Sequence, residues 1–341
     1  MKIVIFEAEQ WEHDAFDPLA SDHELTVLKE PLSADNAKAF EQAEIISTFI
    51  YSDLSAGVLK QFRQLKMIAT RSTGFDHIDL EYCDKNGITI CNVPTYGDHT
   101  VAEHVFGLLL AISHKLIPAI DRTRRGDFSL EGLRGFDLEG KTLGVIGTGN
   151  IGRHVIRIAK GFNMKVMAFD VSPDRELAST LEFEYGDMDT VLAESDIITL
   201  HVPSNEKTHH LISEKEFSKM KDGVVIINTA RGEVLDVHAL AGAIADGKVA
   251  AAGLDVLPEE PTIREEVELL RSVFRKQKKH NIETLLTDHI LLRLRNVYIT
   301  PHNAFNTREA VQRILDVTVE NITAYVSGKP QNVAGKKSRL L

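Results

Sequence analysis

Leu143-Gly-Val-Ile-Gly-Thr-Gly-Asn-Ile-Gly152 decides the fold, because it is an apolar strand that runs into three spaced glycines and then into a helix. Gly147 suits a tight turn, Gly149 lets backbone approach a pyrophosphate, and Gly152 lets the new helix pack closely against the strand. The N–H groups at the start of such a helix favour an anion. The pattern predicts a dinucleotide-binding strand–turn–helix unit, and the alternative is a turn that serves packing alone.

Asp170 ends a second apolar strand, Lys165-Val-Met-Ala-Phe-Asp170. It lies at the distance from the glycines where a carboxylate binds the ribose hydroxyls of a dinucleotide. A carboxylate at this place repels a 2′-phosphate, so the sequence favours NAD over NADP. The alternative interpretation is a solvated acid in the turn before Ser172-Pro173.

The composition is that of a soluble globular protein long enough for two domains. The chain has 341 residues, of which 43% are hydrophobic and 26% are charged. Its net charge of −11, without a long basic run, argues against binding to nucleic acid or to an anionic membrane surface. The longest apolar segment, 105–113, is too short to span a bilayer. Cys83 and Cys91 are too few for a disulfide framework or a metal site, which favours the reducing cytoplasm.

Short apolar strands alternate with amphipathic helices along the chain, which indicates an α/β fold with parallel sheets. In the first part we predict strands at 2–6, 25–29, 45–50, 67–71 and 88–92, with helices near 35–42, 55–63 and 79–85. Long helices are expected over 99–120 and, near the end of the chain, over 307–326. In between we predict the six strands of a complete dinucleotide-binding sheet, near 142–147, 165–170, 197–201, 223–229, 250–255 and 297–301.

The segment 262–296 interrupts this alternation. It is charged, prone to form helix, and adds no strand. An excursion of this length in a compact domain is usually a lid, an oligomer contact or a disordered loop, and the sequence leaves these three interpretations open.

Three polar side chains follow the fourth, fifth and sixth strands of the predicted dinucleotide-binding sheet. They are Arg231 in Asn228-Thr-Ala-Arg-Gly-Glu233, Glu260 in Gly253-Leu-Asp-Val-Leu-Pro-Glu-Glu-Pro261, and His302 in Thr300-Pro-His-Asn-Ala-Phe305. Open α/β sheets bind ligands beyond the carboxyl ends of their strands, so we expect these groups in one crevice. Taken singly, each has an ordinary alternative: a surface ion pair, an exposed acid, or a histidine that caps or packs.

These residue types suit hydride transfer to a carbonyl beside a carboxylate. The Arg231 guanidinium offers a rigid, permanently charged fork to the oxygens. The His302 imidazolium can give a proton to the carbonyl oxygen and take it back in the reverse reaction. A carboxylate from Glu260 favours the protonated form of that histidine. Asp255, at the end of the fifth strand, keeps two interpretations: a positional role, or contact with the surroundings of the nicotinamide.

Together these motifs resemble the D-2-hydroxyacid dehydrogenase family, and within it the D-lactate dehydrogenase branch. The resemblance covers almost the whole chain and also rests on 71–79 (Arg-Ser-Thr-Gly-Phe-Asp-His-Ile-Asp) and on His201-Val-Pro203. It implies a Rossmann-type parallel-sheet NAD domain, 99–304, inserted in a smaller flavodoxin-like α/β substrate domain made of 1–98 and 305–341. It also implies a homodimer with the 99–120 helix near the contact.

Carried over residue by residue, the resemblance implies that His302 is the acid/base, Glu260 its carboxylate partner and Arg231 the substrate clamp. The backbone of Thr73 and Gly74 would hold the substrate carboxylate. The positions that would contact NAD are Gly147, Gly149, Asn150, Ile151, Gly152, Asp170, Val202, Pro203, Thr208, Thr229, Ala230 and Asp255.

Tyr96 and Phe305 match positions that line the side-chain pocket in D-lactate dehydrogenases, and Tyr51 after the third strand joins them. Aromatic walls suit a small apolar group better than a phosphate, and the alternative is ordinary packing. We therefore expect reversible hydride transfer between NADH and pyruvate, or a close small 2-oxo acid, in a cleft between the domains. Two alternatives stay open: a reductase of the same family for glyoxylate, hydroxypyruvate or longer 2-oxo acids, and an NAD-sensing, corepressor-like binding protein.

Overall fold

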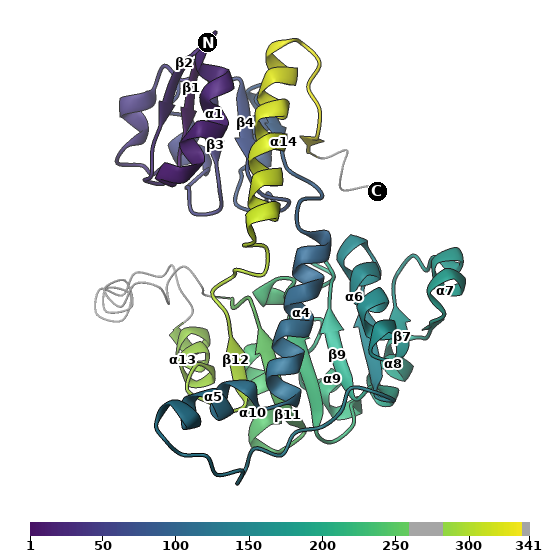
Figure 1. The fold of residues 1–341 in the computed structure, drawn as a ribbon. Helices are drawn as coiled ribbons and strands as arrows, with labels where there is room; N and C mark the ends of the chain where they lie inside the picture. The colour runs from purple at the N-terminus through teal and green to yellow at the C-terminus, as the bar shows by residue number, and fades with distance from the viewer. Residues whose placement is uncertain (259–281, 336–341) are drawn as a thin grey trace. The chain divides into compact units, whose positions relative to one another are not determined.

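The structure, a computed structural model, describes residues 1–258 and 282–335. The chain forms two compact units, one of Met1–Tyr96 with Thr307–Leu341 and one of Gly97–Asn306. It passes between them after Tyr96 and after Asn306, near residues 98 and 305 at which the predicted domains meet. Each unit contains its own sheet with helices packed on it (Figure 1), so the predicted α/β class is confirmed.

The first unit has a sheet in the order β13-β5-β4-β3-β1-β2. Its strands are β1 (Lys2–Ile5), β2 (Glu24–Val27), β3 (Ile45–Thr48), β4 (Met67–Thr70), β5 (Thr89–Cys91) and β13 (Val333–Ala334). β1 to β5 are parallel and correspond to the five predicted strands, whereas β13 pairs antiparallel with β5. The sequence did not predict β13, because two residues are too few for a periodic pattern.

Helices of the first unit cover this sheet. They are α1 (His13–Ala20), α2 (Ala56–Leu59), α3 (Leu80–Lys85) and α14 (Arg308–Val326), with 3-10 turns η1 (Gln10–Glu12) and η2 (Ala37–Phe40). α1 packs against α14, so a helix from the first part of the chain and the last helix lie side by side within this unit (Figure 1). The predicted last helix is confirmed, and the Thr307 side chain caps it by accepting a hydrogen bond from the Ala310 N–H. The sequence missed α1, which contains Pro18.

The second unit has an all-parallel sheet in the order β12-β11-β10-β9-β6-β7-β8. Its strands are β6 (Thr142–Ile146), β7 (Lys165–Phe169), β8 (Glu184–Tyr185), β9 (Ile197–Leu200), β10 (Val224–Asn228), β11 (Val249–Leu254) and β12 (Val297–Ile299). The six predicted strands are confirmed, and the two-residue β8 makes a seventh. The strand order changes direction at β6, which carries the glycines, and open α/β sheets bind their ligands at such a point.

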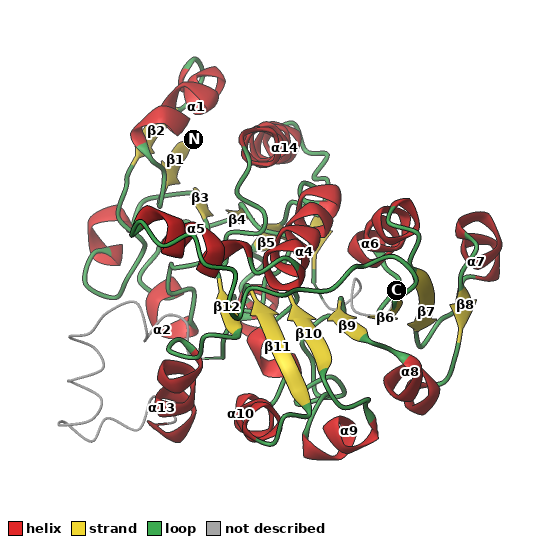
Figure 2. Cartoon of the chain, turned by 60° about the horizontal axis from the view of Figure 1, so that its bottom comes forward, coloured by secondary structure: helices red, strands yellow, loops and turns green. Residues whose placement is uncertain are grey.

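Helices cover both faces of this second sheet, as Figure 2 shows. One apolar layer contains α4 (Asp98–Ser113) and α6 (Asn150–Gly161), and the other contains α9 (Glu214–Lys219), α10 (Val237–Ala245) and α13 (Ile282–Leu291). The remaining helical elements are α7 (Arg175–Leu181), α8 (Met188–Glu194) and the 3-10 turn η3 (Gly232–Val234). Burial on both faces explains why the central strands are apolar throughout.

The single long helix predicted over 99–120 is wrong, because the chain bends by 62° between α4 and α5 (Leu116–Arg124). Lys115 adopts a left-handed conformation with φ 52° at the break. Pro118 explains it, since in a continuous helix its ring would clash with the carbonyl of His114. In the first turn of α5 the missing N–H of Pro118 costs nothing.

No single helix in 1–258 and 282–335 is long and apolar enough to cross a membrane, although α4 and α5 pass that test together as a bent pair. The charged excursion 262–296 falls partly outside the described residues. Its end forms α13, which packs against α10, where the Thr287 Oγ1 lies 2.8 Å from His238 Nδ1. The three interpretations of the remainder stay open.

Candidate active site

The carboxyl ends of six strands in the second unit lie in one row. Pairing runs in register from strand to strand through Phe169, Ile146, Leu200, Asn228, Leu254 and Ile299. The residues that follow this row are Asp170, Gly147, His201, Thr229, Asp255 and Thr300. The sheet therefore brings the predicted cofactor residues and the segments of Arg231 and His302 to one edge. A separate cavity of about 380 Å³ lies where the strands begin, beside Lys141, Ile197 and Val224, and so away from this edge.

The glycine turn has the geometry that the pattern predicts. Gly147 has φ 96°, and a Cβ there would lie 2.6 Å from the His201 carbonyl oxygen. A Cβ on Gly152 would lie 2.1 Å from the Gly147 carbonyl oxygen, so only glycine allows α6 to begin so close to β6. At Gly149 a Cβ would meet nothing within 4 Å, which leaves open space at the start of α6. Asn150 and Ile151 form the first turn of α6, whose N–H groups face that space.

Asp170 is tied to the glycine turn by side-chain contacts. Its Oδ2 accepts hydrogen bonds from the Thr148 N–H at 2.7 Å and the Thr148 hydroxyl at 3.0 Å, and its Oδ1 accepts one from the Ser172 N–H at 2.9 Å. The Thr148 hydroxyl also lies 2.8 Å from the Tyr185 hydroxyl. The carboxylate is thus fixed at the rim of the turn. The sequence did not point to Thr148 or Tyr185, since Tyr185 belongs to the unpredicted strand β8.

We expect Asp170→Ala to lower the preference for NADH over NADPH about 10- to 100-fold. The change removes the negative charge that repels a 2′-phosphate and the charged acceptor for a ribose hydroxyl, an interaction of about 1.5–3 kcal/mol. The measurement is the dissociation constant of each cofactor by fluorescence titration. Asp246→Ala, an exposed acid with the same loss of charge, is the control. An unchanged preference in Asp170→Ala would remove Asp170 from the ribose site.

The other predicted cofactor positions follow β9 and β10. Val202 lies beside Gly147, and the Thr208 hydroxyl donates to the Pro203 carbonyl, which closes the loop after β9. Ala230 donates its N–H to the Asn228 side chain at 3.0 Å. Thr229 is 7% exposed, and its Oγ1 has no hydrogen-bond partner among the residues that the structure describes.

A dinucleotide fits this edge. A cofactor hydroxyl or amide would satisfy the orphaned Thr229 Oγ1, since buried polar atoms are normally hydrogen-bonded. The open space at Gly149 suits a pyrophosphate. Burial lowers the pKa of His201 to about 3, so its ring stays neutral in the physiological range. The residues present therefore fit NAD, and the individual contacts remain predictions.

Arg231 follows β10 in a tightly held turn. The buried Asn228 side chain donates to the Arg231 carbonyl at 3.0 Å, and the Arg231 guanidinium donates to the Ala230 carbonyl at 2.8 Å. Next to it, a Cβ on Gly232 would lie 2.3 Å from the Leu257 backbone carbon. The segments after β10 and β11 are therefore in contact, and Glu260, the predicted carboxylate partner, lies outside the described residues.

His302 follows β12 with its backbone in the left-handed region, at φ 51°. That conformation costs a non-glycine residue about 1–2 kcal/mol. The His302 N–H donates to the Asp255 and Thr300 carbonyls, both at 2.9 Å. The side chain of Asp255 is 1% exposed and accepts hydrogen bonds from this loop. The positional interpretation of Asp255 is thereby supported, while its contact with NAD remains a prediction.

The first unit holds Thr73 and Gly74 after β4. The Thr73 hydroxyl donates to the Val93 carbonyl at 2.8 Å, and the Asn92 amide donates to the Thr73 carbonyl at 2.8 Å. Within the described residues, the N–H groups of Thr73 and Gly74 have no acceptor. Two adjacent, unused N–H groups in a fixed turn are suited to a carboxylate, and that role remains a prediction.

The predicted aromatic residues are partly accessible. Tyr51 is 49% exposed, and its ring lies 6.4 Å from that of Phe49, edge to face. Tyr96 is half-buried, and its carbonyl accepts a hydrogen bond from Arg313 Nε at 2.7 Å. In the second unit Phe305 is half-buried near Gly97. Their place in a substrate pocket remains a prediction.

Comparison with known proteins identifies the family. Residues 106–304 match the model of the "D-isomer specific 2-hydroxyacid dehydrogenase, NAD binding domain" family. The chain belongs to the D-isomer specific 2-hydroxyacid dehydrogenases. The D-lactate dehydrogenase of Escherichia coli is 35% identical over 336 residues, which are 96% of this chain and 98% of that one. The glyoxylate reductase of Thermococcus litoralis is 31% identical and covers 98% of each chain.

Solved structures agree with this membership. A D-lactate dehydrogenase from Aquifex aeolicus, complexed with NAD and lactic acid, superposes with a TM-score of 0.84 at 37% identity and covers 96% of each chain. This member of the 2-hydroxyacid dehydrogenases is therefore an NAD-dependent oxidoreductase with the family's two-domain α/β fold. Its relatives act on more than one 2-hydroxy acid, so membership leaves the substrate undetermined.

Proposed function

We propose that this protein reduces pyruvate, or a close small 2-oxo acid, to the (R)-2-hydroxy acid with NADH, and catalyses the reverse oxidation. The observation that carries the proposal is the row of strand ends that brings the Arg231 and His302 segments together on β10 and β12. Two strand spacings of about 4.8 Å separate these strands, a span that the side chains of Arg231 and His302 can bridge to one small molecule. The D-lactate dehydrogenases among the relatives support lactate chemistry.

In the proposed reaction, different side chains would stabilise the substrate's charge and transfer the proton. Arg231 presents two parallel N–H groups to the carboxylate and carbonyl oxygens of the substrate, and this charge polarises the carbonyl. The N–H groups of Thr73 and Gly74 bind the carboxylate. NADH, when bound, supplies the hydride. The His302 imidazolium donates its proton to the carbonyl oxygen, and Glu260 stabilises the charged imidazole.

The residues predicted to line the substrate pocket favour a small side group on the substrate. Tyr51, Tyr96 and Phe305 offer aromatic surface, and none of them carries a charge that would bind a phosphate. A methyl group, as in pyruvate, matches such walls. The second candidate function is reduction of glyoxylate, hydroxypyruvate or a longer 2-oxo acid. The similarity to the glyoxylate reductase of Thermococcus litoralis supports this alternative.

Oxidation of NADH with a panel of 2-oxo acids tests the proposal. The panel contains pyruvate, 2-oxobutyrate, 4-methyl-2-oxopentanoate, glyoxylate and hydroxypyruvate, and the highest kcat/KM is expected for pyruvate. In the reverse direction, only the (R) enantiomer of lactate should reduce NAD. A higher kcat/KM for another acid would move the assignment to that acid. Tight NADH binding with no turnover on any acid would favour the NAD-sensing, corepressor-like alternative.

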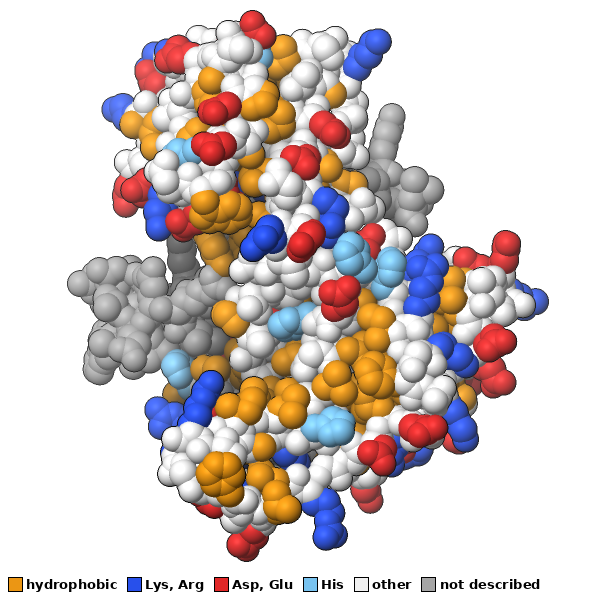
Figure 3. Space-filling view, viewed as in Figure 1, with side chains coloured by type: hydrophobic (Ala, Val, Ile, Leu, Met, Phe, Trp, Pro, Cys, Tyr) orange, Lys and Arg blue, Asp and Glu red, His pale blue; other side chains and the backbone are white. Residues whose placement is uncertain are grey.

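We also propose that the protein is a homodimer formed through the segment after α4. α5 and the loop that follows expose apolar side chains, with Phe128 at 78% and Leu130 at 83% accessible and Leu116, Ile117 and Ile120 at 43% to 47%. Figure 3 shows hydrophobic side chains at this lower end of the second unit. A second copy of the chain is the expected occupant, because five exposed hydrophobic residues on one short segment are unusual for a monomer surface.

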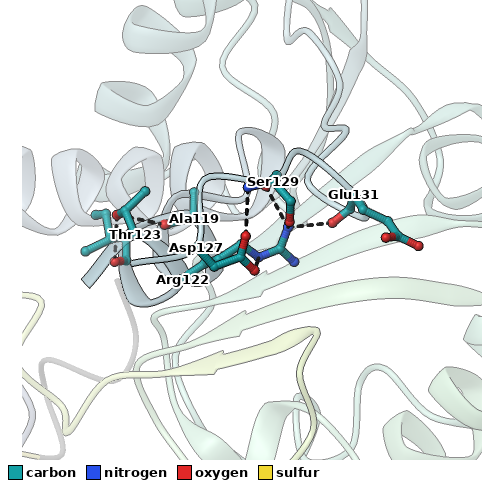
Figure 4. Close-up of polar contacts among 7 residues, drawn as sticks. Ala119, Arg122, Thr123, Asp127, Ser129 and Glu131 are labelled. Carbon is teal, nitrogen blue, oxygen red and sulfur yellow. Dashed lines mark hydrogen bonds and ion pairs between the residues drawn. The ribbon is translucent and has the colours of Figure 1, made fainter. Parts of the chain in front are cut away.

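Arg122 holds this segment in one shape (Figure 4). Its Nη1 donates to the Ser129 carbonyl at 2.9 Å and to the Glu131 carbonyl at 2.7 Å, and the Ser129 N–H donates to Asp127 Oδ1 at 2.8 Å. The loop between Asp127 and Glu131 is thus preformed. A preformed contact segment loses little conformational entropy on association, which supports a stable dimer.

We expect the double change Phe128→Ser and Leu130→Ser to raise the dimer dissociation constant at least about 100-fold. Burial of two large apolar side chains is worth about 1.5–3 kcal/mol each. Sedimentation velocity across a concentration series measures the effect. Trp11→Ser, which removes a 64% exposed aromatic from the first unit, should leave the dimer intact. If the double variant sediments like the unchanged protein, this segment does not form the dimer contact.

We place the protein in the cytoplasm on the basis of its thiols. Cys83 and Cys91 are free and buried, and burial raises their pKa values to about 12 and about 11. Unreactive free thiols are typical of proteins in a reducing compartment. Fractionation of cells that express the protein tests this assignment.

A further inference from the structure

The loop after β12 holds the proposed acid/base in a conformation that needs support. His302 has φ 51°, in the region that residues other than glycine rarely adopt. Such a conformation persists only where the surrounding structure fixes it. The contacts of the loop 300–304 show which groups do so.

Asp255 is the centre of these contacts. Its Oδ1 accepts hydrogen bonds from the Thr300 hydroxyl at 2.6 Å and from the Asn303 N–H at 3.0 Å. Its Oδ2 accepts one from the Ala304 N–H at 3.0 Å, and its backbone carbonyl accepts one from the His302 N–H at 2.9 Å. One buried residue therefore binds the loop on both sides of the histidine.

His104 on α4 extends this arrangement. A hydroxyl has a single proton and a carboxylate only accepts, so the proton of Thr300 is used on Asp255. The Thr300 oxygen then accepts from His104 Nε2, which lies 3.0 Å away and 3.5 Å from Asp255 Oδ1. The contacts assign the proton of His104 to Nε2. These hydrogen bonds form a continuous network from His104 on α4 through Thr300 and Asp255 to the loop that carries His302.

We propose that His104 and Thr300 are positioning residues for His302. They fix the Asp255 carboxylate, which fixes the loop, so that the imidazole keeps the direction that proton transfer requires. The inference rests on the proposed function in naming His302 as the acid/base. A displacement of about 1 Å can cost about 10²-fold in rate. Most of the positions predicted to contact NADH lie in the glycine turn after β6 and in the segments after β7, β9 and β10, away from this loop, so the Kd for NADH is expected to stay unchanged.

Two substitutions at residue 300 separate the hydroxyl from the shape of the side chain. Thr300→Val keeps the shape and removes the hydroxyl, and we expect it to lower kcat about 10- to 100-fold at an unchanged Kd for NADH. Thr300→Ser restores the hydroxyl and should recover kcat to within about threefold. Near-normal kcat in a folded Thr300→Val would overturn the inference, and so would failure of Thr300→Ser to recover kcat.

A second pair tests the histidine. His104→Phe keeps a ring and removes the donor, whereas His104→Gln keeps a donor nitrogen at a similar reach. The inference predicts that His104→Phe follows Thr300→Val and that His104→Gln lies close to the unchanged enzyme. His114→Phe, just after the end of the same helix and exposed, is the matched control and should be neutral. Equal kcat values in His104→Phe and His104→Gln would show that the His104 donor has no part in positioning His302.

A nuclear magnetic resonance measurement keeps this inference separate from the proposed function. The Cε1–H signal of His302, assigned by its absence in His302→Gln, should shift in Thr300→Val and return in Thr300→Ser. If the unchanged enzyme reduces no 2-oxo acid, the proposed function fails, and this signal alone decides the inference. A signal that does not move in Thr300→Val overturns it. Should Thr300→Val not fold, the same comparison is made with His104→Phe and His104→Gln.

Discussion

Replacing His302 by glutamine is expected to lower kcat about 10²- to 10⁴-fold while the Kd for NADH stays within about twofold. Glutamine can still donate a hydrogen bond, but it has no proton to transfer in the physiological range, and general acid–base catalysis contributes about that factor. His302 lies on the segment after β12, whereas the glycine turn follows β6. Stopped-flow single-turnover rates, together with NADH fluorescence titration, measure the two quantities separately.

The control for this experiment is His114→Gln, an exposed histidine in the same unit. It should leave both kcat and NADH binding unchanged. A His302→Gln enzyme with a near-normal rate would refute the assigned role. Loss of NADH binding together with rate would instead show that the loop supports the cofactor edge.

Replacing Arg231 by lysine is expected to lower kcat/KM for the 2-oxo acid about 10²- to 10³-fold. Lysine keeps the positive charge and loses the planar fork that binds two oxygens at once, so the two side chains are not equivalent at such a site. Loss of one preorganised donor at a developing negative charge costs a factor of this size. Steady-state kinetics across substrate concentration give kcat and KM separately.

The split between those constants identifies what Arg231 does. A rise in KM at constant kcat would mean that Arg231 only binds the acid, and a fall in kcat would mean that it also stabilises the transition state. Arg293→Lys, at an exposed position, is the control. A normal kcat/KM in Arg231→Lys would contradict the clamp.

Local patterns in the sequence were sufficient for the parts of the site that are formed by consecutive residues. The glycine turn is an example, because the φ of Gly147 and the close approach at Gly152 involve one strand, one turn and one helix. The order of strands likewise places Asp170, Arg231 and His302 at one edge. These features depend on spacing along the chain, which the sequence displays directly.

Contacts between distant segments could not be predicted in this way. His104 and Thr300 are separated by 196 positions, and nothing in either local pattern indicates that they meet. The apolar pattern continues through the break at Lys115, so hydrophobic periodicity alone predicts one continuous helix there. β8 was missed because two residues show no period. Glu260 and the excursion around it lie outside the described residues, so they remain predictions from the sequence.

The row of strand ends has a consequence for how changes at this edge combine. β7, which Asp170 directly follows, is separated from β10 and β12 by three and five strand spacings, or about 14 and 24 Å. Substitutions at such distances contribute independently to the free energy when they share no partner. The effects of substitutions on cofactor preference, at the end of β7, and on substrate turnover, at the ends of β10 and β12, should therefore add. Each property can then be changed at its own strand end without loss of the other.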